Sequence, residues 1–252
     1  MKQSRIVTWT IAGLCWVGPA LALAAEVKVA VAANFAQPMK DIAAIFEGQT
    51  GHKVALTPGA TGKFYAQITN GAPFEIFVSG DDETPARLDK VGKTVSGTRF
   101  TYAIGRLVLW SPKEGMMSDG GEVLKTGNFR FLSIANPKVA PYGMAAVQTL
   151  QKMGLLMKLE PKVVQGENVA QAHQFVISGN ADLGFVALSQ VWHNGKLKSG
   201  SGWIVPDTFH EPLRQDAVLL DTGAQSEAAK ALLSFMKSDK AKEIMTAYGY
   251  KH

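Results

Sequence analysis

Two turns in the first half of the chain carry polar residues where an anion could bind. Ala33 and Asn34 stand in the turn that ends an expected strand at 27–33, and the glycine-rich run 58–63 contains Thr61. Both turns lead into an expected helix, and open α/β sheets bind ligands outside the carboxyl ends of their strands. An amide, a hydroxyl and the free N–H groups of a helix start are all hydrogen-bond donors. Helix capping is the alternative role of Asn34, and an ordinary glycine turn is the alternative for 58–63.

Two further turns in the second half stand between a strand and a helix in the same way. The run 136–143 holds two prolines, which fix the direction of the N–H groups of Tyr142 and Gly143. In the run 166–169, Val169 can offer only its backbone N–H. Tyr142 as a plain surface aromatic remains an alternative. Four such turns converging on one cleft would form a site made of donors, which favours anion binding over catalysis.

Residue patterns of common enzyme sites are missing from the sequence. The five histidines show no H-E-x-x-H pairing, and no G-x-S-x-G elbow occurs. Asp81 and Asp82 follow an expected strand as neighbours, and we expect a solvated helix cap there. The only cysteine, Cys15, lies in a segment that we expect to be removed. We therefore predict no catalytic residue, no metal bound directly by side chains and no cofactor.

The elements that must position these turns alternate between short β-branched runs and amphipathic stretches. Strands are expected at 27–33, 54–56, 75–79, 131–135, 162–165 and 183–187, and helices at 38–47, 64–69, 84–91, 142–153, 168–178, 226–237 and 239–248. Two long extended runs, 99–110 and 213–220, interrupt this alternation. The pattern predicts two α/β lobes joined by two extended hinge crossings, with a cleft between them. We place lobe I at 25–102 and 217–252, and lobe II at 103–216.

Residues 1–24 have the features of a cleavable signal peptide. Lys2 and Arg5 precede an apolar stretch at 6–17, and A-L-A at 22–24 is a cleavage site. The stretch is shorter than the roughly 18 residues that a membrane-spanning helix needs, which argues against the alternative of an uncleaved anchor. We therefore expect a periplasmic mature protein.

The composition narrows the class of protein further. With 46% hydrophobic and 19% charged residues, the chain can bury a core and is neither disordered nor a polytopic membrane protein. Basic and acidic residues are interspersed without a basic run, so the net charge of +5 does not indicate a nucleic-acid partner.

Seven runs appear in order along nearly the whole chain after residue 24. They are V-A-V-A-A-N-F, P-G-A-T-G-K-F-Y-A-Q-I, N-G-A-P-F-E-I-F-V-S-G-D, R-F-T-Y-A-I-G-R-L-V-L-W, N-P-K-V-A-P-Y-G, E-N-V-A-Q-A-H and A-D-L-G-F-V-A. Together they resemble the periplasmic molybdate-binding proteins of molybdate ABC transporters, the ModA family. The resemblance implies a type II periplasmic-binding-protein fold, in which two α/β lobes with mixed sheets close on one tetrahedral oxyanion.

The resemblance also implies a set of ligand contacts. Matched to the family motifs, these fall on Asn34, Thr61, Tyr142 and Val169, with Ala33 beside the first. They would reach the metal through molybdate oxygens and not as direct ligands. Many members have serine where this chain has Asn34 and Thr61, and some supply a tyrosine hydroxyl where it has Ala187.

The function implied is capture of molybdate and tungstate in the periplasm, followed by delivery to the membrane permease of an ABC transporter. Such a protein is a monomer and not an enzyme. Another oxyanion, such as sulfate or chromate, is the alternative within this class. A secreted hydrolase and the ligand-sensing half of a transcription regulator are the alternatives from other classes, although a signal peptide occupies the end where a regulator has its DNA-binding helices.

Overall fold

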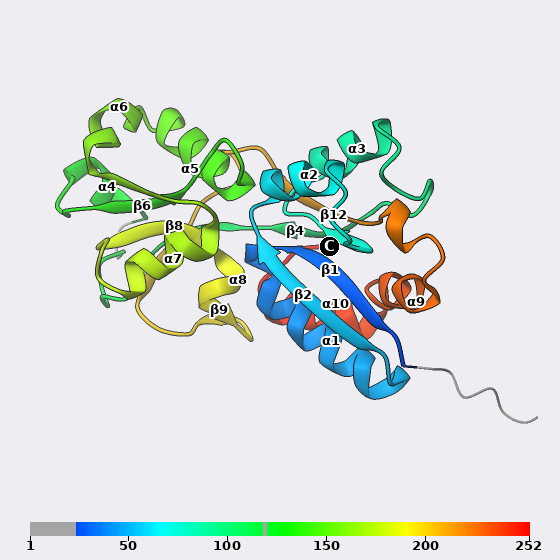
Figure 1. Ribbon diagram of the computed structural model, residues 1–252. Helices are drawn as coiled ribbons and strands as arrows, with labels where there is room; N and C mark the ends of the chain where they lie inside the picture. The colour runs from blue at the N-terminus through cyan, green and yellow to red at the C-terminus, as the bar shows by residue number, and fades with distance from the viewer. Residues whose placement is uncertain (1–23, 118–119) are drawn as a thin grey trace, which may run out of the picture.

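Two lobes lie side by side in the computed structural model, which describes residues 24–117 and 120–252 (Figure 1). Each lobe is built on a five-stranded mixed sheet covered by helices, which confirms the predicted fold class. Lobe I denotes here the body around the first sheet, and lobe II the body around the second. The predicted signal peptide, apart from Ala24, falls outside the described residues. Within the described ranges, no helix has the length and apolar character needed to span a membrane.

The sheet of lobe I has the strand order β2-β1-β3-β12-β4. Its strands are β1 (Glu26–Ala32), β2 (Lys53–Gly59), β3 (Ile76–Val78), β4 (Phe100–Gly105) and β12 (Leu213–Leu219). Strand β1 runs parallel to β2 and β3, whereas β12 lies antiparallel between β3 and β4. The carboxyl ends of β1, β2 and β3 therefore meet at one edge of the sheet.

Helices cover both faces of this sheet. They are α1 (Ala36–Thr50), α2 (Thr61–Thr69), α3 (Glu83–Lys90), α9 (Glu227–Phe235) and α10 (Asp239–Ala247), with the 3-10 turns η1 (Ala33–Phe35) and η3 (Asp221–Gly223). Helix α1 buries Met39, Ile42 and Phe46, which the helical period places on one face. It ends at Gly51, whose φ of 76° lets its N–H close the last turn onto Glu47 O.

The sheet of lobe II has the strand order β11-β5-β8-β6-β7. Its strands are β5 (Leu107–Ser111), β6 (Leu132–Ala135), β7 (Val163–Gly166), β8 (Leu183–Ala187) and β11 (Ser201–Ile204). Strand β6 is parallel to β7 and β8, and β5 is antiparallel to β8 and β11.

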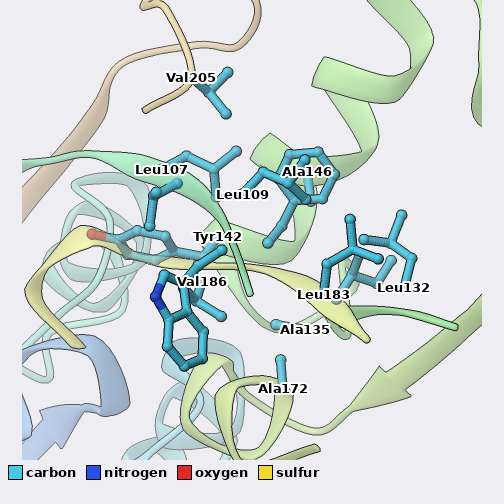
Figure 2. Packing of buried hydrophobic residues seen from close by; sticks show 14 of the residues in the cluster. Leu107, Leu109, Leu132, Ala135, Tyr142, Ala146, Ala172, Leu183, Val186 and Val205 are labelled. Carbon is cyan, nitrogen blue, oxygen red and sulfur yellow. The ribbon is translucent and has the colours of Figure 1, made fainter. Parts of the chain in front are cut away.

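Two main helices, α5 (Pro141–Lys152) and α7 (Val169–Ile177), pack on this second sheet. Figure 2 shows Ala146 of α5 and Ala172 of α7 in one core with Leu107 and Leu183 of the sheet. Short helices complete the lobe at α4 (Glu122–Thr126), α6 (Leu156–Leu159), η2 (Glu160–Lys162) and α8 (Leu188–Val191). Both sheets therefore present strand-to-helix turns at the carboxyl ends of their parallel strands.

The predicted extended run 99–110 forms two strands in two sheets. Strand β4 belongs to lobe I and β5 to lobe II, with Arg106 between them. The chain returns through residues 205–212, which join β11 of lobe II to β12 of lobe I. The lobe boundaries predicted at 102/103 and 216/217 stay predictions. By sheet membership alone, the chain passes from lobe I to lobe II at Arg106 and returns to lobe I through residues 205–212.

A small hairpin in lobe II was not among the predicted elements. Strands β9 (Trp192–His193) and β10 (Lys196–Leu197) pair antiparallel across Asn194-Gly195. Both turn residues have positive φ, 48° and 85°, as a two-residue Asn-Gly hairpin requires. This dipeptide is the sequence signal that could have revealed the hairpin.

A partly buried histidine makes the stability of lobe II dependent on pH. His173 of α7 packs its ring 5.2 Å from that of Trp110, and burial, followed by the charge of Lys198, lowers its pKa to about 4. The unfolded chain then binds more protons than the folded chain between about pH 6.5 and pH 4. The stabilisation is present above pH 6.5 and is lost as the pH falls through this window.

We expect His173→Gln to lose less stability than the wild type on acidification. The expected difference in unfolding free energy between pH 7 and pH 4 is about 2 kcal/mol, because partial exposure of the ring screens its charge. Urea unfolding of both proteins at the two pH values measures it. Equal losses in the two proteins would show that His173 contributes nothing to acid sensitivity.

Candidate functional site

A small cavity lies between the two lobes where four strand-to-helix turns meet. Its volume is about 10 Å³, roughly the space that one water-sized sphere needs. Lobe I contributes residues 32–34 and 59–61, and lobe II contributes residues 140–142 and 168–169. All five predicted site residues are in this lining: Ala33, Asn34, Thr61, Tyr142 and Val169. Their role in binding a ligand stays a prediction, but the structure brings them together.

The first turn places Asn34 in η1, directly after strand β1. Asn34 is 4% exposed and makes no side-chain cap to η1 or α1, so the alternative role of helix capping is wrong. Its amide Nδ2 donates to Gln215 Oε1 at 2.9 Å and to the Tyr250 hydroxyl at 3.0 Å. The amide protons are thus engaged inside lobe I. Donors remain at the start of η1, where the first N–H groups have no partner within the helix.

The second turn places Thr61 at the first position of α2. Its Oγ1 accepts a hydrogen bond from Gly80 N at 3.0 Å, and the residue is 2% exposed. Because a hydroxyl has one proton and two lone pairs, Thr61 Oγ1 can accept from Gly80 and still donate into the cavity. Thr61 therefore offers the cavity a side-chain donor.

The third turn fixes the start of α5. Pro141 occupies the first helical position, and Asn136 O accepts from Val139 N (3.2 Å) and Ala140 N (2.9 Å). A Cβ added to Gly143 would lie 2.3 Å from Ala135 O, so only glycine lets the helix start press against the end of β6.

Tyr142, one position earlier, is 2% exposed and not a surface aromatic. Its ring lies in the core of lobe II with the hydroxyl pointing away from that cluster (Figure 2). The hydroxyl accepts from Gln215 Nε2 at 3.1 Å, and burial raises its pKa well above the usual value. Tyr142 therefore stays neutral and turns its side chain toward β12, while its backbone N–H belongs to the open first turn of α5.

The fourth turn is capped by a side chain. Asn168 Oδ1 accepts from Ala170 N at 2.9 Å and Gln171 N at 3.0 Å. This cap satisfies the N–H groups of the second and third helical positions, whereas the first, at Val169, keeps its N–H without a partner in the helix. The contribution of Val169 to the cavity is thus a backbone donor.

No charged side chain is among the residues that line this cavity. Asp81, which follows β3, has its carboxylate in contact with Thr84 N at 2.9 Å and Thr84 Oγ1 at 3.0 Å. It therefore caps α3, as predicted, but it is partly buried and not solvated as expected, and burial raises its pKa. Helix starts carry partial positive charge, so the electrostatics of the cavity favour an anion without an ion pair. Over residues 24–117 and 120–252, no group of three or more His, Cys, Asp or Glu side chains could hold a metal ion.

Ala187 does not supply a donor to the cavity. It is fully buried at the end of β8, and its N–H donates to Gln190 Oε1 at 2.9 Å. Ala187 is also outside the residues that line the cavity. Position 187 therefore offers the cavity no side-chain hydroxyl.

Comparison with known proteins agrees with this geometry. The family model for bacterial extracellular solute-binding proteins matches residues 27–251. The chain is 59% identical to the molybdate-binding protein ModA of Azotobacter vinelandii over 247 residues, which cover 98% of this chain and 97% of the relative. It belongs to the ModA family of extracellular solute-binding proteins. This confirms the resemblance read from the sequence.

A second relative and a solved structure support this membership. The molybdate-binding protein ModA of Rhodobacter capsulatus is 51% identical over 229 residues, or 91% of this chain and 89% of that one. The periplasmic molybdate-binding protein of A. vinelandii has a similar solved structure, with a TM-score of 0.87 and 44% identity over 90% of this chain and 99% of that chain.

The lobes of this ModA-family chain touch each other around the cavity. Gly62 N donates to Val139 O at 2.9 Å, and Lys63 Nζ pairs with Glu167 Oε1 at 2.8 Å. A third contact joins Ser189 Oγ to the carbonyl oxygen of Asn34 at 2.8 Å. The cleft of this family member is therefore closed.

Two residues that hold Asn34 and Tyr142 in place were not predicted from the sequence. Gln215 of β12 and Tyr250 after α10 are both buried and hydrogen-bonded to the cavity residues. No clear signal for Gln215 was present in the sequence, because the charged residues Arg214 and Asp216 flank it and the three together form a polar stretch. Its buried partners, which a buried polar side chain needs, come from distant parts of the chain.

Proposed function

We propose that this chain captures molybdate and tungstate in the cavity between its lobes. The observation that carries the proposal is a cavity lined by four helix starts and by no charged side chain. Directed N–H groups and partial positive charge suit an oxyanion, and relatives that are 59% and 51% identical are named molybdate-binding proteins.

The donor-only lining supports a fully deprotonated dianion as ligand. Molybdate, tungstate and sulfate carry no proton at neutral pH and need donors alone. Phosphate keeps a proton there, which would lie unpaired in a site without an acceptor, at a cost of roughly 1–3 kcal/mol. Sulfate is the smaller tetrahedron, and the cavity cannot contract around it without strain.

The rest of the proposed role follows from the family. The mature chain acts as a periplasmic monomer that hands its oxyanion to the membrane permease of an ABC importer. It does no chemistry on the ligand and uses no cofactor or nucleic acid. The neutral side chains that line the cavity support this, because they include neither a nucleophile paired with a base nor a general acid.

Calorimetric titration of the chain from residue 25 onward tests the proposal. We expect tight binding of molybdate and tungstate, and binding of phosphate and sulfate that is weaker by about 5- to 150-fold or more. Molybdate affinity should change little between about pH 6 and pH 9, because no carboxylate or imidazole lines the cavity and the pKa of Tyr142 is raised.

Asp81→Asn serves as the matched control. Its carboxylate caps α3 and does not line the cavity, so the preference among the four anions should be unchanged. Phosphate binding as tight as molybdate binding, or a changed preference in Asp81→Asn, would contradict recognition by neutral donors. Sulfate binding tighter than molybdate binding would assign the chain to the alternative oxyanion.

A further inference from the structure

A cluster of buried polar side chains lies next to the cavity, where the chain crosses between the lobes. We call it the hinge cluster: Asn34, Tyr102, Gln215 and Tyr250 from lobe I, and Tyr142 and Ser189 from lobe II. Each of these residues is at most 5% exposed. Hydrogen bonds connect all six side chains, so this cluster couples the two lobes.

Gln215 contacts a predicted binding residue in each lobe, Asn34 in lobe I and Tyr142 in lobe II. Its Oε1 accepts from Asn34 Nδ2 at 2.9 Å and from the Tyr102 hydroxyl at 2.8 Å. Its Nε2 donates to the Tyr142 hydroxyl at 3.1 Å. Gln215 is fully buried, so no water competes for these bonds. One side-chain amide thus joins the cavity residue of lobe I to that of lobe II.

The backbone around Gln215 is shaped to admit this arrangement. A Cβ on Gly105, the last residue of β4, would lie 2.2 Å from the Tyr142 hydroxyl and 2.4 Å from Gln215 Nε2. The pairing of β12 with β4 shifts register between Gln215 and Asp216. Such an irregularity redirects a side chain, and here both Gln215 and Asp216 are buried, with Asp216 paired to Arg99 at 3.0 Å.

We propose that Gln215 is a positioning residue that holds the closed cleft together by joining Asn34 to Tyr142. The inference rests on the proposed function and deepens it. The bond from Gln215 to Tyr142 crosses from lobe I to lobe II, so it exists only while the lobes are together. Gln215 therefore governs how long the oxyanion stays bound more than how fast it arrives.

Tyr142→Phe tests this with the smallest change. The substitution removes the hydroxyl that Gln215 contacts and keeps the ring in the core and the backbone N–H at the cavity. We expect molybdate to dissociate about 3- to 10-fold faster, with an association rate within about twofold of the wild type. Stopped-flow tryptophan fluorescence on the full mature chain, with molybdate as the probe, measures both rates.

Two further variants separate positioning from general stability. Tyr248→Phe is the matched control, because the Tyr248 hydroxyl donates to Asp41 within lobe I and lies outside the hinge cluster. It should leave both rates unchanged. Gln215→Met removes the same interlobe bond from the other side, and we expect the double variant with Tyr142→Phe to release molybdate no faster than Gln215→Met alone.

The melting temperature of the ligand-free protein distinguishes positioning from a purely structural role, because loss of a structural role would lower it. Because the interlobe bond is absent from an open cleft, Tyr142→Phe should change this melting temperature by only about 1–2 °C. An unchanged dissociation rate in Tyr142→Phe, additive effects in the double variant, or equal destabilisation with and without molybdate would each overturn the proposal. Failure of the wild type to bind molybdate would instead refute the proposed function.

Discussion

Gly143→Ala is expected to lower molybdate affinity by about 100-fold or more. The new Cβ would lie 2.3 Å from Ala135 O, 2.7 Å from Ala135 C and 2.9 Å from Asn136 C, all of them backbone atoms that cannot rotate away. The start of α5 must then retreat from β6 and carry the Tyr142 N–H away from the cavity. A lost hydrogen bond to an anion costs about 1.5–3 kcal/mol, and the strain of overpacking adds to that loss.

The same substitution should lower the unfolding free energy of the ligand-free protein by about 1–3 kcal/mol. Calorimetry with molybdate and urea unfolding without it measure the two effects. Gly48→Ala is the matched control, because Gly48 lies in α1 and its Cβ would meet no atom within 4 Å. It should bind molybdate normally and gain about 0.5–1 kcal/mol of stability. Wild-type affinity in Gly143→Ala would show that α5 does not need to press on β6 to bind the ion.

Thr61→Val is expected to weaken molybdate binding by roughly 10- to 150-fold, the equivalent of about 1.5–3 kcal/mol. The substitution keeps the branched shape at the start of α2 and removes the hydroxyl that we propose as a donor to the ion. Gly80 N also loses its acceptor, so a smaller loss of stability should accompany the loss of affinity. Calorimetric titration at constant pH measures the affinity.

Thr61→Ser restores the hydroxyl without the methyl group and should recover most of the affinity. Val169→Ala, on the opposite lobe, should lose much less than Thr61→Val, because the donor of Val169 is its backbone N–H. Equal losses in Thr61→Val and Val169→Ala would mean that packing and not donated hydrogen bonds holds the ion.

Elements with strong local signals were predictable from the sequence. The strand at 183–187 coincides with β8, and the helix expected at 142–153 differs from α5 by one residue at each end. Both have a local cause. The strand is a short, bounded apolar run, and the helix has apolar residues at helical spacing after a proline. Strand β11 was missed, because its sequence S-G-W-I is glycine-containing and becomes a strand only through pairing with β5. Periodicity likewise could not show that the run 99–110 enters two sheets.

The positions of the site residues were more predictable than the directions of their side chains. Ala33, Thr61 and Val169 reach the cavity because strand-to-helix turns of parallel sheets meet at one edge. The amide of Asn34, by contrast, turns toward Gln215, which lies 181 residues away in the sequence. Only the folded chain brings that partner close.

Gly62 has a consequence for how a cleft of this kind can diversify. It donates its N–H to the carbonyl oxygen of Val139, and a Cβ at Gly62 would lie 3.0 Å from Val139 Cα. At this point the lobes therefore meet main chain against main chain, one residue away from the hydroxyl of Thr61. This contact uses no side-chain atom, whereas the hydroxyl that we propose for ion binding is a side-chain group. A substitution at Thr61 that changed the preferred ion would therefore leave this closing contact intact.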